Sequence, residues 1–316
     1  MKHRGLLYLA LASIFMLAVF QGCSKDDPVE ANESEEMFFT SVGLGNQSDS
    51  KDLFLTDAEA LDEWSQLKSL IPGLKKSALA PLTPLRWGRR IDSTSRMLVR
   101  PITKSGDTVA IATIRTVFNG RFIVQGISGV DTVVIHKPYV ETVERSVRFE
   151  RIANTQYPRL NWKLDAVSVL NGGTVNPPLA ITKVEVVLPN ETFTVTDPDT
   201  YFMQILRRWL RGMPTINNVP VTLRVTVQSP KTDADIVTVH HLPGAFGLHH
   251  SPMPMISETQ NGGGYLRVFE KSWTISGNAR KFANLMVSAT TKESLHDNTV
   301  TNFASVVWGI PYKHSN

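Results

Sequence analysis

Cysteine is nearly absent from this chain, since Cys23 is the one thiol in 316 residues. No intramolecular disulfide can form, although small extracellular proteins often depend on such bonds for stability. A zinc site with several thiolate ligands is excluded for the same reason. The roughly 290 residues that follow Cys23 must therefore be held together by apolar burial, and a chain of this length predicts two domains.

Recognised catalytic motifs are also missing. The sequence contains no Gly-x-Ser-x-Gly, no P-loop and no dinucleotide-binding glycine pattern. Gly262, Gly263 and Gly264 follow Asn261 and predict a turn. Acidic residues in the predicted strands have no partner placed by spacing; they are Glu141, Glu144, Glu150 and Asp165. We therefore assign no catalytic residue and expect no cofactor.

The N-terminus has the layout of a secretion signal. Lys2 and Arg4 precede a stretch without charge over residues 5–20, and Gln21, Gly22 and Cys23 close it. The stretch is shorter than the about 20 apolar residues that a membrane-spanning helix needs. Residues 1–22 are therefore predicted to be a signal peptide.

This segment resembles the signal of bacterial lipoproteins, in which the cysteine becomes the first mature residue and carries lipid such as palmitate. Gly22 fits that pattern, whereas Phe20 and Gln21 depart from it. Residues Ser24, Lys25, Asp26 and Asp27 resemble the signal that exports Bacteroidota lipoproteins to the outer face of the outer membrane. The resemblance implies lipidation of Cys23 and surface exposure rather than a periplasm-facing anchor. It also removes the thiol as a nucleophile. The alternative is a soluble secreted protein with a chance cysteine near its cleavage site.

Charge divides the chain into an acidic beginning and a basic body. Residues 25–63 carry twelve Asp or Glu against two Lys, a net of −10, and residues 64–316 carry 29 Lys or Arg against 17 acidic residues, a net of +12. Residues 23–53 are predicted to be a disordered acidic tether. The basic body suits an anionic glycan or an acidic protein partner, or else its charges only keep a β-rich protein soluble.

Residues 54–171 predict helices followed by strands. Thr56 and Glu59 form a capping box, and Leu61, Trp64 and Leu67 recur at helical spacing. Strands are predicted at residues 97–102, 108–118, 121–127, 133–136, 140–152 and 160–170, with Asn119-Gly120 as a hairpin turn.

This order of helices and curved strands, with the junction Trp87-Gly88-Arg89-Arg90-Ile91, resembles the NTF2-like α+β fold. The resemblance implies a cone with an open pocket, which is the basis of an alternative function as an enzyme or small-molecule receptor. An inward-facing arginine at position 145 or 151 would suit that pocket, and a break in strand alternation is the other explanation.

Residues 172–180 predict a linker, and residues 181–316 predict an all-β domain. Seven strands separated by turn signals are expected at residues 181–188, 192–196, 219–228, 235–242, 264–275, 281–290 and 299–310. The pattern resembles immunoglobulin-like and fibronectin-like β-sandwiches without their cysteine pair.

A helical insertion is predicted at residues 199–211, with Arg207, Arg208 and Arg211 on its polar face. The helix either packs on the sandwich with its arginines in solvent or contacts an anionic membrane or glycan, with Trp209 at the boundary. Nearby, His241 and His249 flank a loop and are candidate zinc ligands, although a polar loop explains them equally.

These features favour a lipid-anchored envelope protein that binds or scaffolds partners such as an anionic glycan or an envelope protein. Clusters of arginine and aromatic residues also occur in nucleic-acid-binding proteins. The secretion signal argues against nucleic acid as a partner.

Overall fold

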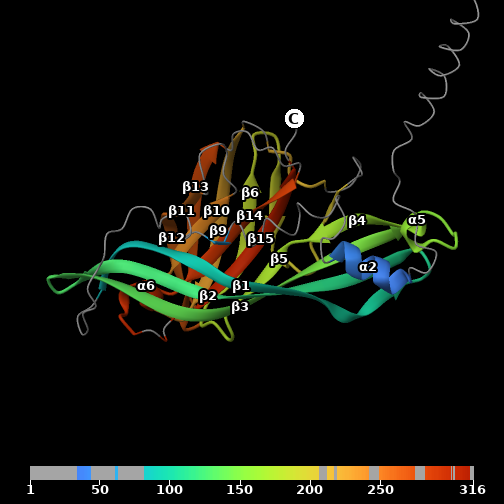
Figure 1. The fold of residues 1–316 in the computed structure, drawn as a ribbon. Coiled ribbons are helices and arrows are strands. Elements are labelled where there is room, and N and C mark those ends of the chain that lie inside the picture. Colours follow the sequence, from blue (N-terminus) through green and yellow to red (C-terminus); the bar gives the residue numbers. More distant parts are fainter. Residues whose placement is uncertain are drawn as a thin grey trace, which may run out of the picture.

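The protein is described by a computed structural model that covers residues 34–43, 61–62, 82–205, 212–216, 219–241, 249–274, 282–299, 301 and 303–313. Most of these residues lie in strands, which form two sheets. Figure 1 shows three long strands that cross beneath the remaining strands, with a short helix beside one end of them. Of the predicted α+β domain followed by an all-β domain, the structure confirms the predominance of strands.

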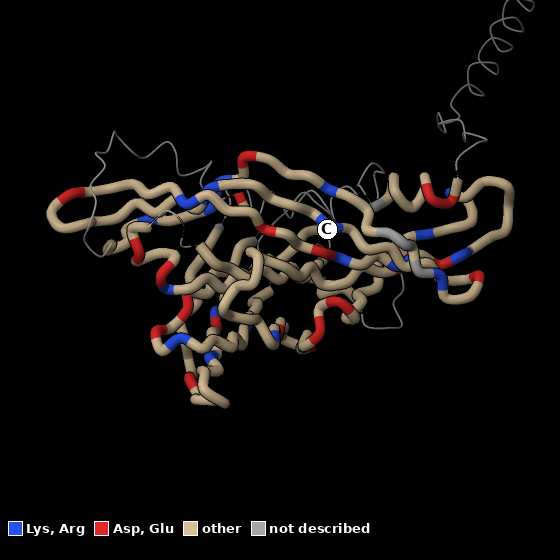
Figure 2. Tube along the Cα trace, turned by 90° about the horizontal axis from the view of Figure 1, so that it is seen from below, with Lys and Arg blue, Asp and Glu red and all other residues tan. Residues whose placement is uncertain are grey.

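The three long strands are β1 (Leu82–Ser105), β2 (Val109–Ser128) and β3 (Asp131–Arg151), and they pair antiparallel in chain order. Buried and more exposed residues alternate along β2 and β3, as expected for strands with one face on a core. Seen from below, the three strands run side by side and extend past the other strands at one end (Figure 2), while at the other end β4 lies beside the last residues of β3.

The hairpin turn predicted at Asn119-Gly120 is wrong, because both residues lie inside β2 and pair with Val140 and Tyr139 of β3. Gly120 serves close packing, since a Cβ atom there would lie 2.3 Å from the backbone oxygen of Arg90. The chain turns instead after β2, where Gly129 has a φ of 66° that favours glycine.

The first sheet continues from these strands into the C-terminal half of the chain. Strand β5 (Leu170–Gly173) pairs with β3 and with β15 (Ser305–Lys313). Beyond β15 follow β14 (Phe282–Thr290), β10 (Ile236–His241) and β11 (His249–Pro252). Strands β4 (Trp162–Ser168) and β8 (Phe202–Gln204) branch off beside β3. Of the predicted linker at residues 172–180, Gly172 and Gly173 lie in β5, and residues 174–179 connect β5 to β6.

The second sheet has the order β12-β13-β9-β6-β7. Its strands are β6 (Ala180–Val187), β7 (Thr192–Val195), β9 (Pro220–Ser229), β12 (Met255–Asn261) and β13 (Gly264–Thr274). All seven strands predicted for this half of the chain are present. Strands β8, β11 and β12 were not predicted.

Two apolar clusters lie on opposite faces of β14 and β15. The larger joins the two sheets and includes Val225, Leu285 and Trp308. The smaller includes Phe118, Met286 and Val307 and fills the concave face of the first sheet. Because both faces are covered, eight of the nine residues of β15 and all nine of β14 are buried.

Short helices flank the sheets. Helix α6 (Lys292–His296) lies between β14 and β15, and α5 (Pro158–Asn161) precedes β4. Lys137 of β3 is fully buried, and its Nζ atom donates to the carbonyl oxygens of Asp297 at 2.7 Å and Glu293 at 3.4 Å. Its ammonium group thus caps the end of α6, where free carbonyls attract cations. Burial lowers the pKa of Lys137 from 10.5 to about 8.

The predicted disordered tether is wrong over part of its length, because α2 (Glu35–Gly43) is a helix docked on the first sheet. Phe38, Phe39 and Val42 are buried. The ring centroid of Phe39 lies 4.7 Å from that of Phe149 and 5.3 Å from that of Trp162. The acidic composition of this segment led to the prediction of disorder. The apolar residues of the helix nevertheless share one face, and this face packs against the long strands.

The predicted helical insertion at residues 199–211 is corrected over residues 199–205, and its remaining residues lie outside the described ones. Residues 202–204 form β8, which pairs with residues 166–168 of β4. Apolar residues of the predicted helix instead lie in or directly after this strand, where Met203 and Ile205 are buried in the larger cluster. A short apolar run does not by itself distinguish a strand from a buried helix.

Candidate functional site

Most residues predicted to carry function lie outside the described residues. These are Cys23, Ser24, Lys25, Asp26, Asp27, Arg207, Arg208, Trp209 and Arg211. Leu61 is described and is fully buried in the smaller cluster, in agreement with its place on a predicted apolar helix face.

The histidines flanking the predicted loop lie in paired strands. His241 of β10 is directly opposite His249 of β11, and His240 is opposite His250. His240 is buried, its Nε2 atom lies 2.8 Å from Ser288 Oγ, and its ring centroid is 6.3 Å from that of His250. Within the described part of the chain, no three histidine, cysteine or acidic side chains are grouped as a metal site requires. The cross-strand pairing of His241 and His249 is therefore the one observation in the described residues that supports a zinc site there.

A buried polar network occupies part of the concave face of the first sheet. Arg89 of β1 donates to Ser288 Oγ at 3.2 Å and pairs with Glu141 Oε1 at 3.4 Å, and Ser305 donates to the same Glu141 oxygen. Arg89 and Glu141 are 2% and 0% exposed. Because β1 and β14 are far apart in the strand order, the Arg89–Ser288 contact shows that the sheet curls back on itself.

This network is enclosed by packed side chains. Arg145 does face inward, as one sequence interpretation proposed, and its Nη2 atom donates to Asn284 Oδ1 at 2.9 Å. Phe118, Met286 and Val307 of the smaller apolar cluster are buried on the same face of the sheet. The Arg89–Glu141 ion pair is therefore buried, and it links β1 to β3 within the first sheet.

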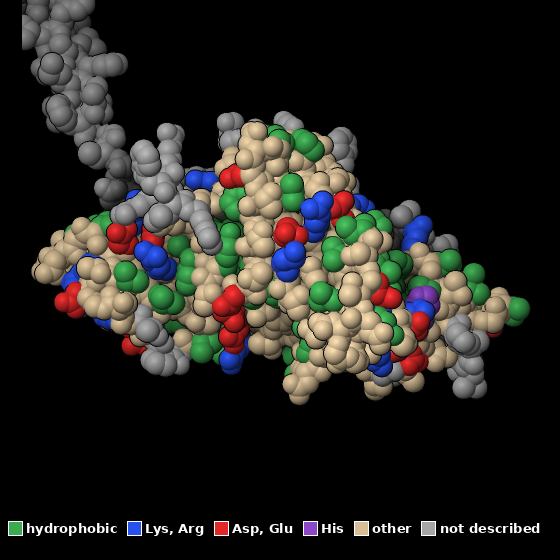
Figure 3. All heavy atoms as spheres, turned by 180° about the vertical axis from the view of Figure 1, so that it is seen from behind, with side chains coloured by type: hydrophobic (Ala, Val, Ile, Leu, Met, Phe, Trp, Pro, Cys, Tyr) green, Lys and Arg blue, Asp and Glu red, His purple; other side chains and the backbone are tan. Residues whose placement is uncertain are grey.

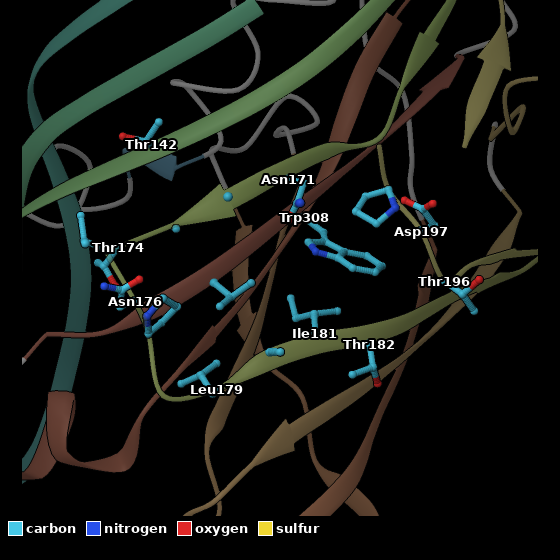
Figure 4. A pocket seen from close by; sticks show the side chains of 17 residues that line it. Thr142, Asn171, Thr174, Asn176, Leu179, Ile181, Thr182, Thr196, Asp197 and Trp308 are labelled. Carbon is cyan, nitrogen blue, oxygen red and sulfur yellow. The ribbon is translucent and has the colours of Figure 1, made fainter. Parts of the chain in front are cut away.

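An open groove lies on the other face of the first sheet, where the two sheets diverge (Figure 4). Its volume is about 830 Å³. The floor is formed by Thr142 of β3, Asn171 and Gly173 of β5, and Val306 and Trp308 of β15. The walls are formed by residues 174–182, among them Leu179 and Ile181, and by residues 196–198. We call this site the Trp308 groove.

Backbone packing fixes the floor of the groove. Gly173 lies between Thr142 and Val306 in the sheet, and its φ of 152° is unfavourable for other residues. A Cβ atom at Gly173 would lie 2.2 Å from the backbone oxygen of Ser305. Because Gly173 has no side chain, the groove extends down to the backbone at this position.

Trp308 and Asn171 present polar groups within the groove. They are direct cross-strand neighbours, so their side chains share one face of the sheet. Figure 4 shows the indole of Trp308 between Asn171 and Ile181, with its nitrogen toward the side lined by Thr174 and Asn176. Trp308 is 3% exposed, and no group in the described residues hydrogen-bonds its indole N–H or the Asn171 side-chain amide.

The described lining of the groove has little charge, since Asp197 is the one ionisable side chain among the described residues that form it. Thr200 Oγ1 donates to Asp197 Oδ2 at 2.6 Å, and the Asp199 amide donates to Oδ1 at 3.2 Å. These hydrogen bonds, led by that of Thr200, lower the pKa of Asp197. The carboxylate therefore stays ionised at neutral pH.

Several charges elsewhere on the described surface are paired. Along the long strands, Arg115 pairs with Glu144 at 2.6 Å and Arg121 with Asp92 at 2.7 Å. Figure 2 shows basic and acidic positions close together along these strands, and Figure 3 shows the two kinds mixed on the rear face. In these two views, basic and acidic side chains of the described residues are therefore mixed.

The sequence interpretation missed the Trp308 groove. Its lining comes from β3, β5, β15, the start of β6 and the chain after β7, which are distant in sequence. Locally, the sequence offered only the predicted linker at residues 172–180, which includes part of the groove lining.

Comparison of the chain with known protein families, curated proteins and solved structures finds no match. Among the helices in the described residues, none has the length and apolar character needed to cross a membrane.

Proposed function

We propose that this protein is a lipid-anchored envelope protein whose folded body binds a partner through the Trp308 groove. Lipid on Cys23 would hold it to the outer membrane, with the body on the cell surface. The export-signal pattern at residues 24–27 and the signal-like segment before it support this localisation. We also propose that residues 54–171 have an NTF2-like fold and that residues 181–316 have an immunoglobulin-like fold.

The open groove is the observation that supports a binding function. It combines apolar walls with a few polar groups, Asn171, Asp197 and the Trp308 N–H, which is the usual make-up of ligand sites. The buried Arg89–Glu141 pair, in contrast, is enclosed. A partner without strong net charge is favoured by the neutral lining. Preference for an anionic glycan would depend on Arg207, Arg208 and Arg211, which lie outside the described residues.

Site-specific photo-crosslinking on intact cells tests this proposal. A photoreactive amino acid placed at Thr142 should crosslink to an envelope component, because Thr142 lies on the groove floor. The matched control is Val140, which is 49% exposed two residues earlier on the same face of β3 and does not line the groove. Equal crosslinking from both positions, or none from either, would contradict a binding role for the groove.

The anchor is tested separately with Cys23→Ser. We expect the wild type to incorporate a labelled fatty acid and to be cleaved by protease added to intact cells. The variant should lose the label. A wild type that carries no fatty acid would contradict the lipoprotein assignment without affecting the groove.

A further inference from the structure

We propose that the Trp308 groove takes an extended segment of a partner polypeptide, which lies along the open edge of β6 as an added strand. This inference rests on the proposed binding function and specifies its ligand class. The argument depends on the pairing of β6, on how Trp308 is buried and on the charge of the lining.

Strand β6 has a free edge inside the groove. Residues 184–187 pair with residues 192–195 of β7, whereas residues 180–183 pair only with β9 in the described part of the chain. Ala180, Ile181 and Thr182 all line the groove. Unpaired N–H and C=O groups on a strand edge are a template for another strand.

The end of β7 explains why this edge is open. Continuing its register would place Thr196, Asp197 and Pro198 opposite residues 183, 182 and 181. Proline has no N–H to donate to a ladder. The Asp197 carboxylate also accepts hydrogen bonds from Asp199 and Thr200, which turns the chain away from β6. The groove is the space left between β6 and this departing segment.

The burial of Trp308 favours a polypeptide over a sugar. Sugars are commonly bound by stacking on the exposed face of an aromatic ring, but Trp308 is 3% exposed. It offers an indole N–H, and Asn171 beside it offers an amide. Both residues line the open groove, where main-chain carbonyls of an extended peptide would accept hydrogen bonds from these two groups.

The lining also indicates the kind of side chains that fit. Leu179, Ile181 and Val306 are apolar, and Thr142 and Thr174 are neutral. The segment should therefore be uncharged over the centre of the groove. A basic residue would fit best beside Asp197, where the carboxylate is ionised.

The test uses peptides selected from a display library of short uncharged sequences on the full-length protein. Selected peptides should bind the wild type and Val140→Trp with similar affinity. Thr142→Trp should weaken binding by about tenfold or more, because the larger side chain occupies the floor of the groove. N-methylation of alternate peptide amides should produce a similar loss, since it removes main-chain hydrogen bonds without changing side chains.

Variants of the floor add a second measurement. Asn171→Leu should weaken the selected peptides while thermal unfolding confirms that the protein is folded. Affinity that is unchanged in Thr142→Trp, or insensitive to amide methylation, would overturn the inference. A glycan that binds the wild type but not Thr142→Trp would also overturn it, yet would leave the proposed binding function intact.

Discussion

Replacement of Arg267 by methionine should lower the free energy of unfolding, because it leaves a buried carboxylate beside the second sheet without its cation. The Arg267 and Asp235 side chains are 0% and 1% exposed, and their closest charged atoms lie 3.2 Å apart. Arg267 also donates to Glu258 Oε2 at 2.6 Å and to the carbonyl oxygens of Lys231 and Thr232 at 2.7 and 2.8 Å. One guanidinium thus ties the β9–β10 loop to β12.

The expected loss is about 3–5 kcal/mol in the free energy of unfolding at pH 7, because Arg267→Met leaves the Asp235 carboxylate buried without its cation. This is a large part of the stability of a typical domain. Burial already raises the pKa of Asp235 in the folded protein, even with Arg267 present. Without the guanidinium, the pKa of this carboxyl should rise further.

This shift predicts how the loss depends on pH. Above the unfolded-state pKa of Asp, about 3.9, the folded variant binds more protons than its unfolded chain. Its stability should therefore fall as pH rises toward the raised pKa of Asp235. The difference between wild type and Arg267→Met should consequently be larger at pH 7 than at pH 5.

Urea unfolding followed by circular dichroism at several pH values measures these differences. The matched control is Arg224→Met in β9, because Arg224 is 46% exposed and pairs with Glu270 on the surface. That substitution should change stability little. A loss for Arg267→Met below about 1 kcal/mol, or one that does not vary with pH, would refute the assigned role of the ion pair.

Three further predictions concern other parts of the fold. Stability of the wild type should rise by about 2–3 kcal/mol between pH 8 and 10.5, where Lys137 is neutral when folded but charged when unfolded, and urea titrations of Lys137→Met should lack this rise. Phe39→Ala should cost about 3–5 kcal/mol in urea unfolding, whereas Met37→Ala, at a position 57% exposed, should cost little. Gly173→Ala should lower the thermal midpoint more than Gly129→Ala, because only Gly173 would place a Cβ atom against backbone. Equal midpoints would contradict the packing assigned to β5.

Local sequence patterns predicted the C-terminal strands well. Residues such as 181–188 and 219–228 alternate apolar and polar side chains, and turn residues separate them, so each strand is visible in its own sequence. Strand β12 was missed because all seven of its residues are exposed, and no alternation marks it. Strand β8 was missed because its three residues sit within a run that also fits a helix.

Features that depend on contacts between distant segments were not predictable. The Asn119-Gly120 pair has the composition of a hairpin turn, but long pairing with β1 and β3 keeps it extended. Residues 172–180 predicted a linker, whereas Gly172 and Gly173 pair with β3 on one side and with β15 on the other. The groove follows from that same tertiary pairing, and no spacing in the sequence encodes it.

The central claim is that the Trp308 groove is occupied when the protein is in its native envelope. Hydrogen exchange of residues 174–180, which form one wall of the groove, tests this claim even while the partner is unidentified. Exchange should be slower in isolated envelopes than in the purified protein, while the turn at Gly129 should exchange equally in both. Equal exchange at residues 174–180 in the two preparations would contradict the account.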